Sequence, residues 1–520
     1  MSDPEPEIPQ SDLERRFEKV RSTLGLILAP VLFLVIWWLP LSAPPNPPGL
    51  EGVVQAGAPL KPQAHALAAI MATVIWLWLT EPIPMTVTAL LGAAGCVVLG
   101  VADAKTVFAP FADPLMFLFI GSFILARAIF LHGLDRRLAF GVMSLRWVGA
   151  RPSRILFAYG AVTAFISAWI SNTATTAMML AIGLSLVRFL KDATDGNFRV
   201  DQRFATGLML MTSFAASIGG LATPIGTPPN VIGLRFIKEE LGIEIPFLKW
   251  MVIGVPVVTV LYLFLFSYLN RFCPAGVDEI PGSTEMLNRN RDSLGAWTAG
   301  QRSTLFAFGL TTFLWILPGI VALGWGEQGP LYAKVRSCLP EGVVAILGAS
   351  LLFLLPGNCA GRAIDWSKAT QIDWGVVLLY GGGFTLGELA NNTGLATAVG
   401  TRLAGLMPGG GEWTLLVGGT LLAALVSEAT SNTASANIVV MLVISMARAA
   451  GVDPLAPALG ATFGASLGFM LPVSTPCNAI VYGTGLVPLP RMIRYGLLLD
   501  VVGVAVIIVL IRLLLPWIRT

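Results

Sequence analysis

The chain carries little charge for its length. Only 12% of its 520 residues are Asp, Glu, Lys or Arg, whereas 55% are hydrophobic and the mean hydropathy is +0.76. Soluble domains usually carry about twice that charged fraction, so the composition excludes an ordinary soluble protein. Apolar stretches long enough to cross a bilayer recur along the chain, and their uninterrupted character favours helices over the strands of a barrel. The sequence therefore predicts an all-α polytopic membrane protein.

Histidine and paired cysteine are also scarce. His65 and His132 are the two histidines, and the five cysteines contain no Cys-x-x-Cys pair. A metal centre needs more ligands than these, and a disulfide framework needs pairs. The chain has no His-Glu-x-x-His motif either, so we expect a protein that is not an enzyme. No basic cluster indicates nucleic acid as a partner.

Glycine and proline, in contrast, are plentiful, with 55 and 35 residues. Such a content is typical of membrane helices that are broken or closely packed. The apolar runs predict about eleven transmembrane helices and two re-entrant hairpins. We place the spans at about 24–42, 64–82, 84–101, 114–132, 204–240, 249–270, 303–323, 342–356, 373–391, 454–487 and 496–516, and the hairpins at about 155–189 and 413–447.

These runs predict the domain organisation. A polar cytoplasmic tail comes first, and two related repeats follow it, separated by a polar linker that we expect to be loop-like. The predicted boundaries are 1–23 for the tail, 24–63 for the first span and its outer loop, 64–270 for the first repeat, 271–301 for the cytoplasmic linker and 302–520 for the second repeat.

Two pairs of polar islands interrupt the apolar runs. Ser171-Asn172-Thr173 and Ser431-Asn432-Thr433 lie inside the two predicted hairpins, and each is followed by a second island, Gly226 to Asn230 or Ser474 to Asn478. Small polar side chains in apolar segments are costly unless they have partners. Proline removes a backbone donor and glycine permits an unwound path. We therefore predict broken helices at 204–240 and 454–487, the first unwound at about 223–228.

The basic residues predict the orientation, because cytoplasmic loops carry an excess of Lys and Arg. With a cytoplasmic N-terminus most basic residues lie inside, and Lys105, Lys334 and Arg336 are exceptions. The first hairpin then enters from the cytoplasm and the second from outside. The repeats are therefore predicted to be inverted, as in secondary transporters with a midplane site. If each hairpin were a full span, the count would change and this inference would weaken.

The islands offer a definite chemistry. Half-helix N-termini present N–H donors to carboxylate or phosphate oxygens, while unwound backbone and Ser, Thr and Asn oxygens suit a hard monovalent cation. No Lys or Arg lies at any of the four islands. A bound dianion would therefore need cations to offset its charge, which is a physical reason for coupling.

Other interpretations remain open at this point. A single Ser-Asn-Thr in a membrane helix more often forms hydrogen bonds that hold neighbouring helices together. A single Gly-Thr-Pro-Pro-Asn is more often a kink or a loop. The motif is also compatible with a neutral solute or with cation exchange. The repetition in matching order favours a binding site. For Glu428, shortly before Asn432, two interpretations stay open: a polar anchor in a cavity, or a carboxylate that takes part in coupling.

At these residues the chain resembles the divalent anion/sodium symporter family, the sodium-coupled di- and tricarboxylate transporters similar to solute carrier 13. The resemblance covers nearly the whole chain and rests on Ser-Asn-Thr-Ala-Thr at 171–175, Ser-Asn-Thr-Ala-Ser at 431–435, and the segments 226–230 and 472–478. It implies a homodimer whose protomers each have a static scaffold part and a transport part that moves in elevator fashion.

The resemblance also implies site residues. The first sodium site would use Ser167, Ser171, Asn172 and Gly226, and the second would use Ser427, Ser431, Asn432 and Ser474. The substrate carboxylates would contact Asn172, Thr173, Thr227, Asn432, Thr433, Thr475 and Pro476. Cys477 departs from the pattern, because the first repeat has Pro229 there and relatives often have proline.

The function implied is sodium-coupled symport of C4-dicarboxylates such as succinate, malate and fumarate. The location expected is a bacterial-type cytoplasmic (inner) membrane, with lipid and the small-molecule substrate as partners. Exchangers of this family can place fixed positive charge where sodium would sit, and no such residue lies near these islands. A sulfate, tricarboxylate or exchange carrier is the alternative within the family, and an anion channel is the alternative from another class.

Overall fold

A computed structural model describes residues 12–42, 59–192, 201–358, 361–405 and 411–519. Throughout these residues the regular structure is helical, and two isolated bridges, Ser42 with Pro59 and Pro356 with Arg362, are the β-type pairings. The prediction of an all-α protein is therefore confirmed. Residues 1–11 of the predicted tail and 43–58 of the predicted outer loop lie outside the described residues.

In the described residues, the first half contains eleven α-helices. They are α1 (Asp12–Trp38), α2 (Pro62–Thr80), α3 (Met85–Val98), α4 (Ala104–Phe108), α5 (Pro114–Leu131), α6 (Leu134–Met143), α7 (Pro152–Ser167), α8 (Asn172–Asp192), α9 (Gln202–Gly219), α10 (Pro228–Leu241) and α11 (Phe247–Phe272), with the short 3-10 turns η1 (Ala109–Ala112) and η3 (Gly220–Ala222).

The second half is also helical in its described residues. Its helices are α12 (Ser283–Asp292), α13 (Ala299–Trp325), α14 (Pro330–Cys338), α15 (Glu341–Leu354), α16 (Trp366–Ala369), α17 (Trp374–Asn392), α18 (Leu395–Ala404), α19 (Glu412–Ala429), α20 (Asn432–Ala449), α21 (Leu455–Gly464), α22 (Pro476–Tyr482) and α23 (Leu489–Arg519).

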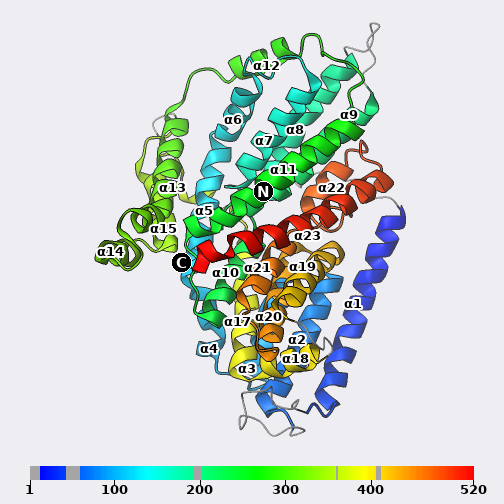
Figure 1. Cartoon of the computed structure of the whole chain (residues 1–520), viewed down its shortest axis with the longest axis vertical. Helices are drawn as coiled ribbons and strands as arrows, with labels where there is room; N and C mark the ends of the chain where they lie inside the picture. The colour runs from blue at the N-terminus through cyan, green and yellow to red at the C-terminus, as the bar shows by residue number, and fades with distance from the viewer. Residues whose placement is uncertain (1–11, 43–58, 193–200, 359–360, 406–410, 520) are drawn as a thin grey trace.

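By length and composition, nine helices of the described part could each cross a membrane, or ten if the bent pair α14 and α15 is one span. The hairpin helices α19 and α20 are among the nine. The chain is therefore a multi-pass membrane protein. The molecule is elongated, with α6, α7 and α8 towards one end and α2, α3 and α18 towards the other (Figure 1).

Three helices differ from the sequence-based expectations. α1 covers Asp12–Trp38, so residues 12–23 of the predicted tail continue the first span as helix. The linker contains the amphipathic helix α12, whose Leu287 is buried and whose Met286 packs against the same core. The mostly polar composition of the linker gave no sign of this helix. α23 begins at Leu489 rather than 496, because Arg491 and Arg494 extend the helix beyond its apolar part.

The predicted hairpins and broken helices are each interrupted at a polar island. α7 and α8 are separated by residues 168–171, and α19 and α20 by residues 430–431. α10 begins at Pro228 and α22 at Pro476, the first helical position, where proline costs no hydrogen bond. Ser431 caps α20, because its Oγ accepts a hydrogen bond from Ala434 N at 3.2 Å.

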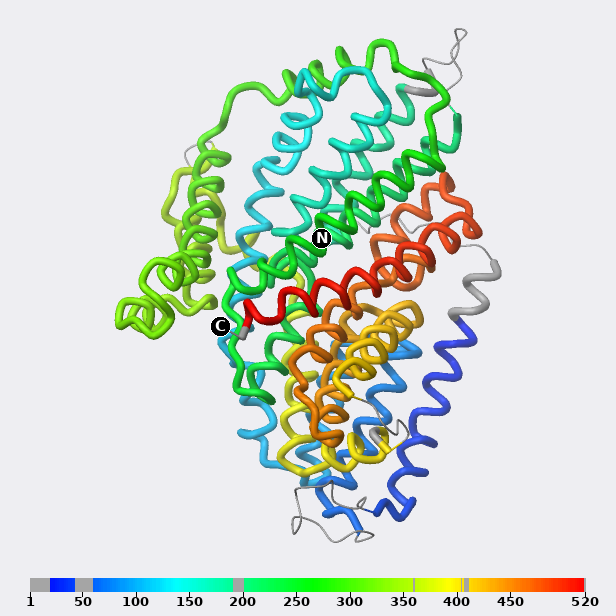
Figure 2. Tube along the Cα trace, in the orientation of Figure 1, coloured from blue at the N-terminus to red at the C-terminus, as the bar shows by residue number. Residues whose placement is uncertain are grey.

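The two halves of the chain are interleaved. α10 packs against α20 and α21 of the second half, while α22 packs against α8 and α9 of the first. α11 and α23 also pack together, and Figure 2 shows them side by side across the middle of the molecule. Trp250 of α11 stacks on Phe463 of α21 with ring centroids 4.7 Å apart. Each restarted helix therefore contacts the hairpin or broken helix of the other half.

Candidate functional site

The first pair of islands forms a compact cradle around Asn172, the first residue of α8. Ser167 Oγ, at the end of α7, donates to Asn172 Oδ1 at 2.8 Å, and Asn172 Nδ2 lies 3.5 Å from Thr227 Oγ1. Ser171 Oγ accepts from Ala174 N at 3.4 Å. A Cβ at Gly220 would lie 2.4 Å from Asn172 Oδ1, so the backbone of the broken helix directly contacts the hairpin tip. We call Ser167, Ser171, Asn172, Gly220 and Thr227 the first cradle.

The second pair of islands repeats this geometry around Asn432. Ser427 Oγ donates to Asn432 Oδ1 at 2.8 Å, the same distance as in the first cradle. A Cβ at Gly468 would lie 3.1 Å from Ser427 Oγ, 3.3 Å from Asn432 Oδ1 and 3.3 Å from Ser474 Cβ. We call Ser427, Asn432, Gly468 and Ser474 the second cradle. Gly468 and Gly220 therefore occupy matching places.

An asparagine holds open the break in each broken helix. Asn230 Nδ2 donates to Gly220 O at 2.9 Å and Thr223 O at 2.8 Å, which are ten and seven residues earlier. Asn478 Nδ2 donates to Gly468 O at 2.9 Å and Leu471 O at 3.0 Å, at the same separations. The site predicted from the sequence included neither Gly220 nor Gly468, and it did not include these hydrogen bonds from the two asparagine side chains. The signal that could have revealed them is a glycine ten residues before the asparagine in both halves.

The cradles leave some substrate candidates accessible and bury others. Thr173 and Pro476 are exposed, Asn172 and Asn432 are partly exposed, and Thr227, Thr433 and Thr475 are buried. Thr475 Oγ1 accepts from Asn478 N at 3.2 Å and so caps α22. Among the residues described, no Lys or Arg forms an ion pair with either cradle. The groups at the cradles are hydroxyls, amides and backbone groups, and helices α8, α10, α20 and α22 begin there.

Comparison with known proteins identifies the family. The model of the sodium:sulfate symporter transmembrane region matches residues 22–519. The chain belongs to the sodium:sulfate symporter family. The predicted resemblance to the divalent anion/sodium symporter family is thereby confirmed.

The relatives of this symporter-family chain are transporters. It is 31% identical over 509 residues to the sodium-dependent dicarboxylate transporter SdcS of Staphylococcus saprophyticus, covering 97% of this chain and 93% of that protein. SdcS of Staphylococcus aureus strain RF122 is 32% identical over 502 residues, covering 95% and 91%.

Solved structures with 14% sequence identity share the fold. One is the Neisseria gonorrhoeae protein MtrF, an antimetabolite efflux pump, with a TM-score of 0.53 and 94% of each chain covered. Another is the Alcanivorax borkumensis YdaH transporter, also with a TM-score of 0.53, covering 95% of this chain and 98% of that one.

In this family member Cys477 lies close to the first cradle, next to residues of α8 and α9. Its thiol is buried beside the hydroxyl groups of Thr173, Thr176 and Ser217. Next to it, Ser213 Oγ of α9 donates to Asn478 Oδ1 at 2.6 Å. The N-terminal end of α22 therefore contacts α8 and α9, and Cys477 is part of this contact between the two halves of the chain.

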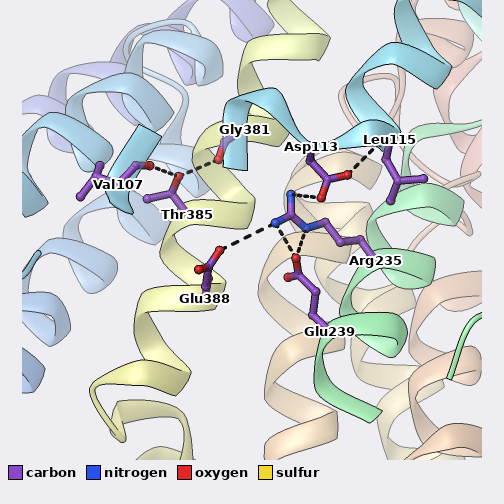
Figure 3. A network of polar contacts seen from close by, with 8 residues as sticks. All are labelled: Val107, Asp113, Leu115, Arg235, Glu239, Gly381, Thr385 and Glu388. Carbon is purple, nitrogen blue, oxygen red and sulfur yellow. Dashed lines mark hydrogen bonds and ion pairs between the residues drawn. The ribbon is translucent and has the colours of Figure 1, made fainter. Parts of the chain in front are cut away.

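The family member also contains an ionic cluster that the sequence analysis did not single out. Arg235 of α10 is 2% exposed and faces Asp113, Glu239 and Glu388, with N–O distances of 3.6, 2.6 and 3.9 Å (Figure 3). Its guanidinium also lies 3.8 Å from the ring centroid of Phe384. The cluster ties α10 to α17 and to Asp113, the residue that caps α5. The signal that could have found it is Arg235 one helical turn before Glu239 at the end of an apolar stretch.

Proposed function

We propose that the protein is a sodium-coupled symporter of C4-dicarboxylates such as succinate, malate and fumarate. The observation that carries this proposal is the pair of matching cradles, which offer oxygen ligands and helix N-termini but no basic side chain. A buried dianion without a basic partner needs bound cations to offset its charge. The names of the relatives, sodium-dependent dicarboxylate transporters, support the same cation and the same substrate class.

The proposed sodium sites lie at the two cradles. The first would use Ser167, Ser171, Asn172 and Gly226, and the second would use Ser427, Ser431, Asn432 and Ser474. Substrate carboxylates would contact Asn172, Thr173 and Thr227 on one side and Asn432, Thr433, Thr475 and Pro476 on the other. The accessibility of Thr173 and Pro476 among largely buried neighbours supports their place at the substrate.

The proposed mechanism is of the elevator type. The hairpins α7–α8 and α19–α20 and the broken helices α9–α10 and α21–α22 would move together as the transport part. The interleaving of α10 with α20 and α21, and of α22 with α8 and α9, supports this grouping. We further propose inverted repeats at 64–270 and 302–520, about eleven spans with two re-entrant hairpins, and a homodimer in a bacterial inner membrane with a cytoplasmic N-terminus.

The test is uptake of labelled succinate by the purified protein in proteoliposomes. We expect an inward sodium gradient to drive accumulation and choline substituted for sodium to abolish it. Counterflow with labelled succinate, malate, fumarate, citrate and sulfate would identify the substrate. Uptake that persists at full rate in choline would overturn the symport proposal.

Sulfate is the second candidate substrate, because the family description names it. Sulfate is a compact dianion, so both cradles would have to approach more closely than for a four-carbon dicarboxylate. Counterflow that responds to unlabelled sulfate and not to unlabelled succinate would favour it.

A further inference from the structure

Two buried carboxyl groups lie against the second cradle and have no role in the proposed sites. Glu428 is near the end of α19 and is 5% exposed, and Asp500 is within α23 and is 7% exposed. Gly496 permits their approach, because a Cβ there would lie 2.3 Å from Phe469 O. α23 therefore rests directly on the backbone of the second broken helix, beside the second cradle.

The two carboxyl groups differ in their partners. Glu428 Oε1 accepts from Met470 N at 2.7 Å, and its Oε2 accepts from Ser474 Oγ at 2.5 Å and from Leu471 N at 3.3 Å. Among the described residues, neither buried oxygen of Asp500 forms a well-aligned hydrogen bond, and its carboxyl group lies beside that of Glu428 and the backbone of Phe469. In the described ranges, neither carboxylate forms an ion pair with Lys or Arg. Asp500 thus places two unsatisfied oxygen atoms next to the hydrogen-bonded carboxylate of Glu428.

Such a pair is costly in a membrane protein. Two adjacent carboxylates repel each other, and burial removes the water that would otherwise stabilise each charge. A bound cation relieves both effects at once. The available ligands are all oxygen atoms, namely the two carboxylates and the hydroxyl group of Ser474, and oxygen ligands suit hard cations.

We propose that Glu428, Asp500 and Ser474 form a third sodium site, distinct from the two cradles. This inference rests on the proposed sodium coupling and deepens it. Ser474 belongs both to this site and to the second cradle, so occupation of one site would orient a ligand of the other. A third co-transported sodium ion would also make uptake of a dianion carry net positive charge into the cell.

The test measures the coupling ratio from reversal potentials in proteoliposomes, with labelled succinate and set sodium gradients. We expect Asp500→Asn to transport one fewer sodium ion per succinate than the wild-type protein and to show a lower Hill coefficient for sodium. Glu428→Gln gives the same test by a second route should Asp500→Asn fold poorly. The matched control is Asp135→Asn, since Asp135 is also buried with an unpartnered oxygen but lies in α6, away from the cradles.

The outcomes separate this inference from the proposed function. Wild-type uptake that ignores sodium would overturn the proposed function itself. A folded Asp500→Asn protein with the wild-type coupling ratio and Hill coefficient would overturn only the third site. A variant that keeps the sodium ratio but loses co-transport of a proton, followed with a pH-sensitive dye inside the vesicles, would also overturn it, because the pair would then bind a proton rather than sodium.

Discussion

Asn478 repeats the hydrogen bonds of Asn230: each side-chain amide donates to the carbonyl groups ten and seven residues before it. The two asparagines lie in different halves of the chain, yet both close the unwound segment of a broken helix. The carbonyl groups of Gly220 and Gly468 are held next to the cradles in this way. Asn230 and Asn478 therefore position backbone carbonyl groups and are not among the residues proposed to contact the substrate.

Replacing either asparagine by alanine should weaken sodium binding through the backbone. Asn230→Ala and Asn478→Ala each leave two buried carbonyl groups without a donor, which typically costs about 1–3 kcal/mol for each unsatisfied group. We expect a lower unfolding temperature in detergent and a higher sodium concentration for half-maximal uptake. The control is Asn392→Ala, at an exposed position, which should match the wild-type protein in both measurements. Unchanged sodium dependence in the folded variants would contradict the positioning role.

Asn172 and Asn432 should be essential for uptake. Each supplies an amide oxygen that accepts from a serine at 2.8 Å within a cradle. We expect Asn172→Ala and Asn432→Ala to abolish sodium-driven succinate uptake while the purified proteins elute as the wild-type protein does in size-exclusion chromatography. Wild-type uptake by either variant would remove that cradle from the proposed site.

Gly220 and Gly468 should tolerate alanine to different degrees. A Cβ at Gly220 would lie 2.4 Å from Asn172 Oδ1, whereas the nearest atom to a Cβ at Gly468 is 3.1 Å away. Overpacking typically lowers stability by about 1–3 kcal/mol, so Gly220→Ala should lower the unfolding temperature and, by displacing Asn172, the apparent sodium affinity. Gly468→Ala should lower both less. Gly309→Ala is the control, because nothing lies within 4 Å of its Cβ position. An equal loss in both cradles would contradict this ranking.

Arg235 should stabilise the fold strongly. Arg235→Gln leaves three carboxylates without their shared cation, and removing one partner of a buried ion pair typically costs about 3–5 kcal/mol. We expect a large drop in the thermal unfolding temperature, partly restored when Glu239→Gln is added. Arg203→Gln is the comparison, because its pair with Asp201 is exposed and should be worth about 0–1 kcal/mol. Equal effects of Arg235→Gln and Arg203→Gln would contradict the importance of the buried cluster.

Sodium itself should stabilise the purified protein before the substrate does. A ligand that binds only the folded state adds about 2.7 kcal/mol at a concentration 100 times its dissociation constant. We expect sodium chloride, unlike choline chloride at equal ionic strength, to raise the unfolding temperature, and succinate to add further stabilisation only when sodium is present. Succinate stabilisation in choline alone would show that the anion does not need bound sodium.

The sequence by itself determined the membrane class, the all-helical fold and the family. Low charge, long apolar runs and twice-repeated polar islands are local properties of the chain, and the cost of polar groups in an apolar setting makes them conspicuous. The breaks at Pro228 and Pro476 were also visible, because proline at a first helical position follows local rules.

Only the tertiary structure decided which distant groups meet. The approach of Gly220 to Asn172, of Asp500 to Glu428 and of Arg235 to Glu388 depends on how separate helices pack. Likewise, α12 packs Leu287 and Met286 against the core, a contact that the polar sequence of the linker does not indicate. Packing contacts join residues far apart in the chain, so helix periodicity and composition carry no record of them, and the close approach of two helices is set by small residues such as Gly496.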